Sequence, residues 1–279
     1  MLEYQPIMAN QTTLSEPPEL LPPELYPCVE HLVTEDNKAV DSVFSEKQMR
    51  LLTEPLFSSW QGRNEGRKFV AFANVGLFCS VLQPPYVPDM LLSLDVELPA
   101  DVHPKAHRSY FMWLYGKPPD IVVEIVSNKQ GSEDIEKLAG YARIGVPYYV
   151  IHDPDRQLSE RAVRAYQLEV KNYRPIEEPI WFPEINLGLR LWQGRYEDLD
   201  STWLRWVDVN GEPVPSGSER AEQERIRAEQ EHTRAEQEHT RAEQERVRAE
   251  QERMRAELER EHVGRLTEQL RRLGAEPEV

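Results

Sequence analysis

The chain of 279 residues contains only two cysteines, Cys28 and Cys79, and neither stands in a CxxC pair or near other metal-ligating residues. The sequence therefore offers no disulfide framework and no zinc motif. It also lacks a basic segment followed by an apolar run near its start, and no apolar stretch is long enough to span a membrane. We expect a cytoplasmic protein without a membrane partner.

Common catalytic motifs are missing as well. The sequence contains no Gly-rich phosphate loop and no Gly-x-Ser-x-Gly nucleophile elbow. The histidines before the repeat are scattered without metal-ligand spacing, so we interpret them as structural or surface residues: His31, His103, His107 and His152. Carboxylates and lysines are left as the candidates for chemistry.

Positive charge is scarce, since 33 Lys and Arg stand against 49 Asp and Glu, a net charge of −16. From Glu219 to the end there are 13 Arg and 17 Glu, so this part accounts for −4 and the rest for about −12. Because duplex binding depends on Lys and Arg that neutralise phosphates, an acidic body needs a basic patch or bound cations to approach DNA. Two loops offer patches, although ordinary solvated charge is the simpler interpretation of each: Arg63, Arg67 and Lys68, and Lys105, His107 and Arg108.

Composition divides the chain into four segments. All 6 Trp, 7 Phe and 11 Tyr lie before Pro215, whereas Arg, Ala, Glu and Gln dominate the remainder. We predict a Pro/Glu-rich arm over residues 1–27, one globular domain over 28–210, a linker over 211–218 and a helical tail over 219–279.

The tail repeats a seven-residue unit, RAEQERI and its variants, from Arg220 onward. If Ile226 and its equivalents take heptad position d, glutamines such as Gln223 take position a. At least half of the a and d positions, which form the contact between two helices, are then polar, and a coiled coil would be weak. The same frame sets Glu222 at g and Arg227 at e, an attractive pairing. A solvated single helix and a dimerising coiled coil both remain open.

Hydrophobic patterns in the body predict a mixed α/β fold. An opening helix is expected over 46–60, and strands over 69–78, 87–96 and 121–126. A helix over 132–144 and a strand over 147–152 follow, an order that predicts a right-handed crossover and a parallel strand pair. Antiparallel strands near 164–170 and 181–192 would close the domain.

Two carboxylates stand out at strand positions. Asp89 begins one predicted strand, and Glu124 interrupts the apolar run IVVEIV, where a lone carboxylate is costly unless it is paired or metal-bound. Lys137 shares a helix face with Asp134 and Tyr141, and its ammonium could stabilise charge on a phosphate. The alternatives are a strand-end Glu that faces solvent and a surface Asp–Lys pair.

These segments, VPDMLLSLDV and PPDIVVEIVSNKQGSEDIEKLAGYARIGVPYYVIHDP, resemble the Uma-two family of restriction-like endonucleases, within the PD-(D/E)XK superfamily. The resemblance extends from about Ser42 to the repeat. It implies a restriction-endonuclease-like mixed sheet flanked by helices, DNA as substrate, and Mg²⁺ or Mn²⁺ as cofactor. It also implies that Asp89, Glu124 and the carbonyl of Ile125 bind the metal.

One departure from the superfamily concerns the lysine, which ordinarily lies two residues after the second acid. Val126 stands there in this chain, and the family pattern instead carries a helix lysine that corresponds to Lys137. Lys129 is nearer to the acid and remains the alternative.

The resemblance assigns further residues to supporting positions. Ser127, Asp134 and Tyr141 match recurrent family positions, while Tyr148 stands where many relatives carry Glu. On the opening helix, Glu46 or Gln48 could supply a further ligand, although a solvated residue at a helix start is the simpler interpretation of both.

The sequence thus favours a Mg²⁺-dependent DNA endonuclease in which Asp89, Glu124 and Lys137 are catalytic. One alternative is an inactive nuclease-fold scaffold or binding protein that self-associates through its C-terminal helix, with a homodimer formed through the core or the tail. Hydrolysis of another phosphate substrate is the third possibility, because no base-specific recognition module is recognisable.

Overall fold

The structure, a computed structural model, describes residues 22–34, 42–60, 66–127 and 133–272. The chain forms two compact units, Met1–Gly217 and Ser218–Val279. Most of the predicted N-terminal arm lies outside the described residues, and its end forms a short 3₁₀ turn, η1 (Pro23–Leu25).

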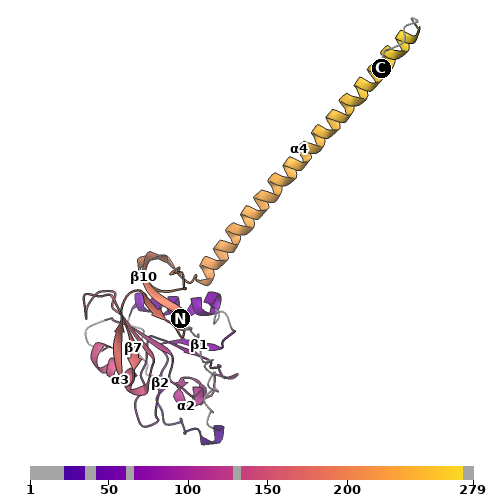
Figure 1. The fold of residues 1–279 in the computed structure, drawn as a ribbon. Coiled ribbons are helices and arrows are strands. Elements are labelled where there is room, and N and C mark those ends of the chain that lie inside the picture. Colours follow the sequence, from indigo (N-terminus) through magenta and orange to yellow (C-terminus); the bar gives the residue numbers. More distant parts are fainter. Residues whose placement is uncertain (1–21, 35–41, 61–65, 128–132, 273–279) are drawn as a thin grey trace, which may run out of the picture. The chain divides into compact units, whose positions relative to one another are not determined.

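A six-stranded mixed sheet forms the centre of the first unit, and it confirms the predicted α/β fold (Figure 1). Only the two middle strands run parallel, and the connection between them is helical, as the strand–helix–strand pattern predicted. In spatial order the strands are β1 (Phe69–Ala73), β3 (Met90–Leu94), β5 (Ile121–Ile125), β6 (Tyr148–His152), β7 (Val163–Glu169) and β8 (Asn172–Ile176).

Helix α1 (Val43–Pro55) covers one face of this sheet, and the π-helical turn η2 (Leu56–Trp60) continues it. Ser42 caps the helix, since its Oγ accepts a hydrogen bond from the Ser45 N–H at 3.0 Å. Leu52 and Leu56 are fully buried in a cluster with the β3 side chains Met90 and Leu92. The predicted opening helix is therefore confirmed, with a start three residues earlier than expected.

The opposite face is covered by the π-helical turn η4 (Glu133–Lys137) and helix α3 (Leu138–Ile144), which connect β5 to β6 (Figure 1). A second cluster on this face joins Val122 and Val126 to Tyr141. All five residues of β5 are buried, because the strand has a helical layer on both sides. The candidate residue Glu124 is thus held inside a two-sided core.

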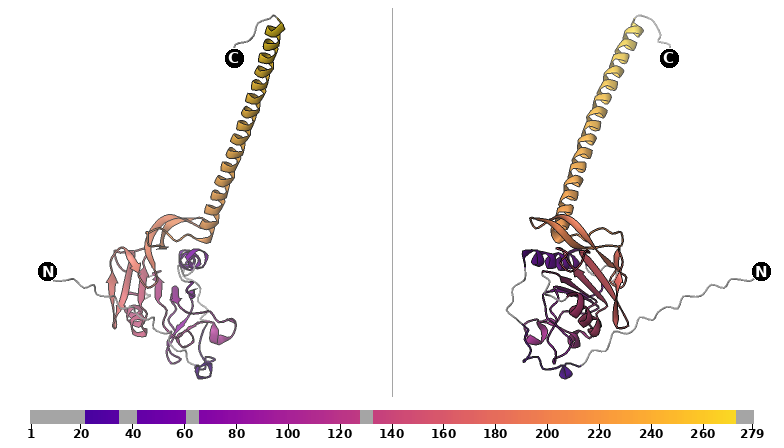
Figure 2. Two further views of the ribbon diagram at one scale, coloured as in Figure 1. Left: turned by 45° about the vertical axis from the view of Figure 1, so that its right-hand side comes forward. Right: turned by 90° about the vertical axis from the view of Figure 1, so that its left-hand side faces the viewer.

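A smaller antiparallel sheet packs over α1, and Figure 2 shows its long hairpin from two sides. Its contact with α1 is specific: Trp206 Nε1 donates to the Leu52 carbonyl at 2.7 Å. The strands are β9 (Ile180–Phe182), β10 (Leu187–Tyr196) and β11 (Leu199–Val207). The remaining short elements are β2 (Leu77–Phe78), which pairs in parallel with β4 (Tyr110–Phe111), the 3₁₀ turn η3 (Lys105–His107) and α2 (Met112–Tyr115).

The segment that composition predicted as a linker carries buried residues. The Val214 N–H donates to the Trp206 carbonyl at 2.9 Å, and Arg205 donates to the Val214 carbonyl at 2.9 Å. Ser216 is also buried. Residues 213–216 therefore pack against the smaller sheet.

Helix α4 (Gly217–Arg272) runs for 56 residues and buries none of them. Its repeat is rich in Ala, Glu, Gln and Arg, all strong helix formers, which accounts for its length. None of the helices in the described part of the chain combines the length and the apolar composition needed to cross a bilayer.

Candidate active site

Asp89 and Glu124 are brought together by strand register. Strands β3 and β5 are antiparallel, with Met90 opposite Val123, so one further step sets Asp89 opposite Glu124. Both acids point to the face covered by α3, because side chains alternate along a strand and Leu91 and Val122 belong to the cluster on that face. The two carboxylates therefore lie on one face at one edge of the central strands.

The backbone fixes Asp89 from two sides. Its Oδ2 accepts a hydrogen bond from the Ile125 N–H at 2.6 Å. Its carbonyl accepts from the Asn74 N–H at 3.1 Å, where Asn74 adopts a left-handed conformation (φ 54°) at the end of β1. The first contact ties Asp89 directly to the residue whose carbonyl was predicted as a metal ligand.

Glu124 is 1% exposed, and both of its carboxylate oxygens are bound by side chains from the covering helix. Lys137 Nζ lies 2.8 Å from Oε2, and the Tyr141 hydroxyl donates to Oε1 at 2.6 Å. Lys137 and Tyr141 are one helical turn apart, so a single helix face presents both donors. The structure thus brings together four of the predicted site residues: Asp89, Glu124, Lys137 and Tyr141.

Burial is the main cause of the raised pKa values at this site. The pKa of Glu124 is raised from 4.5 to about 7 in total: burial raises it most, the positive charge of Lys137 lowers it, the negative charge of Asp89 raises it, and the hydrogen bonds from Lys137 and Tyr141 lower it. Burial and the Glu124 charge raise the pKa of Tyr141 well above its ordinary value. Tyr141 is therefore a neutral hydrogen-bond donor at physiological pH.

Two neighbours that the sequence did not suggest as site residues are Tyr86 and Gly140. The rings of Tyr86 and Tyr141 lie 5.0 Å apart between centroids. A Cβ atom at position 140 would lie 2.5 Å from the Tyr86 hydroxyl, so only glycine allows Tyr86 to approach α3 this closely. No motif spacing links residues 86 and 140, and only the fold reveals the contact.

Other candidates occupy different positions. The Ser127 carbonyl accepts from Gln157 Nε2 at 3.1 Å just beyond β5. Asp134 belongs to η4, but its side chain lies outside what the structure describes, as does the whole of Lys129. Tyr148 points to the opposite sheet face and donates to Glu184. The presence of Tyr where many relatives carry Glu therefore does not alter the surroundings of Glu124.

The two candidates on α1 make contacts of their own. Glu46 forms an ion pair with Arg50 one turn later. Gln48 is fully buried, where its Nε2 donates to the Leu204 carbonyl at 2.8 Å and its Oε1 accepts from the Leu204 N–H at 2.9 Å. The NH2 group and the carbonyl oxygen of the Gln48 side-chain amide thus both bind the β11 backbone.

The basic loop residues are tied to acidic side chains or to backbone carbonyls. Arg67 pairs with Asp95, and Lys68 with Glu97. Lys105 Nζ donates to the Glu30 carbonyl at 2.6 Å. Arg63 lies outside the described residues.

The donor set fits a hard divalent cation. Within the described ranges no group of three or more His, Cys, Asp and Glu side chains could hold a metal. Two carboxylates suffice for Mg²⁺, however, because this ion keeps several of its waters. The repulsion between Asp89 and Glu124 also favours a cation, since a positive charge beside them would offset it.

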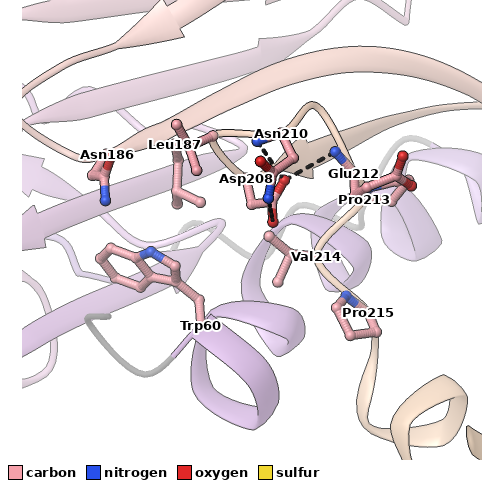
Figure 3. Close-up of a pocket in the computed structure, with 10 residues that line it drawn as sticks. Trp60, Asn186, Leu187, Asp208, Asn210, Glu212, Pro213, Val214 and Pro215 are labelled. Atoms are coloured by element: carbon pink, nitrogen blue, oxygen red, sulfur yellow. Dashed lines mark hydrogen bonds between the residues drawn. The ribbon is translucent and has the colours of Figure 1, made fainter. Parts of the chain in front are cut away.

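A separate hollow of about 310 Å³ is lined among others by Trp60, Asn186 and Asp208, which are drawn in Figure 3. Trp60 packs against Phe69, at the end of β1 remote from the Asp89 edge. The Asp208 carboxylate caps its own loop by accepting from the backbone N–H groups of Asn210 and Glu212. This hollow is distinct from the acid pair.

The fold and the acid pair define a class of protein: a mixed sheet flanked by helices, with two carboxylates at the edge of its central strands, is the restriction-endonuclease-like arrangement. The family model described as "Uma2: Putative restriction endonuclease" matches residues 41–200, more than half of the chain. The chain therefore belongs to this family, within the PD-(D/E)XK superfamily, which confirms the resemblance and indicates a nuclease. No curated protein and no solved structure matches the chain.

Proposed function

We propose that this protein is a metal-dependent endonuclease that hydrolyses phosphodiester bonds of DNA. One observation carries the proposal: Asp89 and Glu124 share one face of the sheet edge, and Lys137 binds Glu124 at 2.8 Å. A structural ion pair accounts for Lys137 and Glu124 but does not require a second negative charge beside Glu124, whereas a metal site does.

Asp89, Glu124 and the Ile125 carbonyl are the groups that would hold Mg²⁺ or Mn²⁺. When bound, the cation supplies positive charge for the phosphate and lowers the pKa of water. It also compensates for the acidic body, which otherwise repels a polyanion.

The remaining side chains orient the acids and stabilise charge. Tyr141 fixes the rotamer of Glu124 through its 2.6 Å hydrogen bond. Lys137 is 30% exposed while Glu124 is 1% exposed, so the ammonium reaches from the buried acid toward solvent, where it can donate to a phosphate oxygen. Lys129 is the alternative source of this charge, and Ser127 and Asp134 are proposed to support the strand-to-helix turn.

The test is cleavage of supercoiled plasmid and single-stranded DNA in Mg²⁺ or Mn²⁺. The variants are Asp89→Ala and Glu124→Ala, with Glu136→Ala as the matched control because Glu136 is an exposed carboxylate on η4. We expect cleavage that needs the metal, is lost in both acid variants and is retained in the control. Folded protein that cuts no substrate, or acid variants that still cut, would contradict the proposal.

Metal affinity separates a nuclease from a scaffold that keeps only the fold. Titration of Mn²⁺ into wild-type protein and Asp89→Ala should show tight binding only to the wild type. Equal binding by both proteins would mean that Asp89 is not a ligand. Lys137→Met and Lys129→Met, compared in the same cleavage assay, identify the lysine that acts in catalysis.

A further inference from the structure

Helix α4 exposes apolar side chains at a seven-residue interval. Ile226, Val247 and Met254 are 42%, 49% and 59% exposed, and Thr233 and Thr240 occupy the equivalent positions between them. A glutamine lies three residues before each of these five positions. An isolated helix gains nothing from such a regular row, whereas a partner helix can cover it.

The surface of α4 is hollowed along the same row. Two shallow depressions lie on the helix, and each is lined only by the row itself, its glutamines and the charged residues that flank them. The first is lined by Ile226, Glu229, Gln230, Thr233, Arg234 and Gln237, and the second by Thr233, Glu236, Gln237, Thr240, Arg241 and Gln244. Holes bounded by consecutive seam residues are what a facing helix fills with its own side chains.

Within the repeat, the ion pairs between residues four apart do not use the better orientation. These pairs run from Arg to Glu, as in Arg227–Glu231 at 3.1 Å and Arg234–Glu238 at 3.2 Å, and the reverse order occurs after the repeat, in Glu268–Arg272. Glu placed four residues before a cation stabilises a single helix more than the reverse order. The repeat is therefore poorly explained as a device for strengthening an isolated helix.

Glutamate precedes arginine by five residues instead, as in Glu222 and Arg227, Glu229 and Arg234, and Glu236 and Arg241. Residues five apart point about 140° away from each other on one helix, so they cannot pair there. In two parallel helices the same spacing joins position g of one chain to position e of the next heptad on the other.

We propose that α4 pairs with α4 of a second copy of this chain as a parallel, in-register coiled coil. Every g position in the regular repeat is Glu and every e position is Arg, so a parallel pair sets opposite charges together along its length. An antiparallel pair sets Glu against Glu and Arg against Arg, which is repulsive. The charges at positions e and g thus favour the parallel orientation, whereas the polar residues at positions a and d do not distinguish parallel from antiparallel.

The parallel arrangement joins both Met1–Gly217 units to the same end of the coil, because α4 begins at Gly217 in each chain. Polar Gln layers at position a select register and weaken the association. The dimer is therefore expected to dissociate on dilution. This inference does not depend on nuclease activity.

Cysteine cross-linking of the full-length chain tests the orientation. Cys28 and Cys79 are free and are first replaced by Ser, after which Ile226→Cys and Met254→Cys are introduced separately. A parallel pair brings each new cysteine next to its own copy, so both variants should form disulfide-linked dimers of twice 32.5 kDa under mild oxidation. In an antiparallel pair centred on the repeat, like residues are about 42 Å apart and neither variant cross-links.

Charge reversal in trans tests the pairing. One variant carries Arg227→Glu, Arg234→Glu and Arg241→Glu, and the other carries Glu222→Arg, Glu229→Arg and Glu236→Arg. Each alone should self-associate about tenfold or more weakly than wild type in sedimentation, since six weak contacts are inverted, and an equimolar mixture should recover the dimer. Helicity, followed by circular dichroism, detects any loss of the helix itself.

Three results would overturn the proposal. They are a monomeric wild type across the concentration range, a dimer in which neither cysteine variant cross-links, and a mixture of charge variants that associates no better than its components.

Discussion

Replacing Glu124 with glutamine removes a buried ionisable group while keeping the size of the side chain. Because burial raises the pKa of Glu124 to about 7, the native state binds a proton more readily than the unfolded chain, whose carboxyl has its ordinary pKa of 4.5. The stability contributed by this proton is fully present below pH 4.5 and is lost as the pH rises through 7. Wild-type protein should therefore lose stability from this group as the pH rises.

The magnitude follows from the size of the shift. One pKa unit corresponds to about 1.4 kcal/mol, and between pH 6 and pH 8 the native carboxyl goes from mostly protonated to mostly charged. The free energy of unfolding of wild type, relative to Glu124→Gln, should fall by about 1 kcal/mol over this interval. The hydrogen bonds lost in Glu124→Gln change its free energy of unfolding by the same amount at both pH values. This change therefore cancels when the two pH values are compared.

Urea unfolding at pH 6 and pH 8, in the presence of EDTA, measures the difference. This range stays above the isoelectric point of about 5.0, where solubility is lowest. Glu136→Gln is the matched control, because Glu136 is an exposed carboxylate on η4. Its pH dependence should equal that of wild type.

Adding a metal ion to the same unfolding experiment gives an independent test of Glu124. Mg²⁺ in place of EDTA at pH 8 should raise the unfolding midpoint of wild type but not of Glu124→Gln, because a ligand of the native state stabilises it. If wild type and Glu124→Gln respond identically to pH, the reasoning about the buried carboxylate is refuted. If Mg²⁺ stabilises Glu124→Gln as much as wild type, Glu124 is not a ligand of the proposed metal.

Three further changes test neighbouring contacts. Tyr141→Phe should lower the free energy of unfolding by about 1.5–3 kcal/mol and Mn²⁺ affinity by roughly 10-fold, measured by urea titration and calorimetry, because it deletes one donor to Glu124. Gln48→Leu should cost about 2–4 kcal/mol in the same unfolding assay, since it leaves two backbone groups of Leu204 unpaired; a neutral result would contradict the buried contact. Burial lowers the pKa of His152 from 6.5 to about 4, so its stabilising effect is present above pH 6.5 and is lost as the pH falls through 4. Relative to His152→Leu, wild type should lose about 1 kcal/mol between pH 7.5 and pH 5.5, and parallel curves for the two proteins would argue against this.

Local patterns in the sequence were sufficient for much of the fold. The β-branched run around Glu124 predicted a strand buried on both faces, and the following helix and strand predicted the parallel pair of β5 and β6. The seven-residue repeat predicted a helix, and the structure has one over Gly217–Arg272. These features depend on neighbours along the chain, so periodicity reveals them.

The site residues were recognisable for the same reason. Asp89 at a strand start and Glu124 inside an apolar run are each anomalous in their own segment, where a carboxylate carries a desolvation cost. The spacing of Lys137 and Tyr141 gave their common helix face. The sequence by itself thus determined which side chains were candidates.

Only the tertiary structure showed which of the candidate residues lie in contact. Register between β3 and β5 sets Asp89 opposite Glu124, a contact 35 residues apart in sequence. The packing of α3 on the sheet brings Lys137 to Glu124, and Gly140 admits Tyr86 beside it. Buried side-chain contacts likewise bind Gln48 to β11. Such contacts depend on how distant segments are packed together, and the residues near each position in the chain carry no periodic signal of that packing.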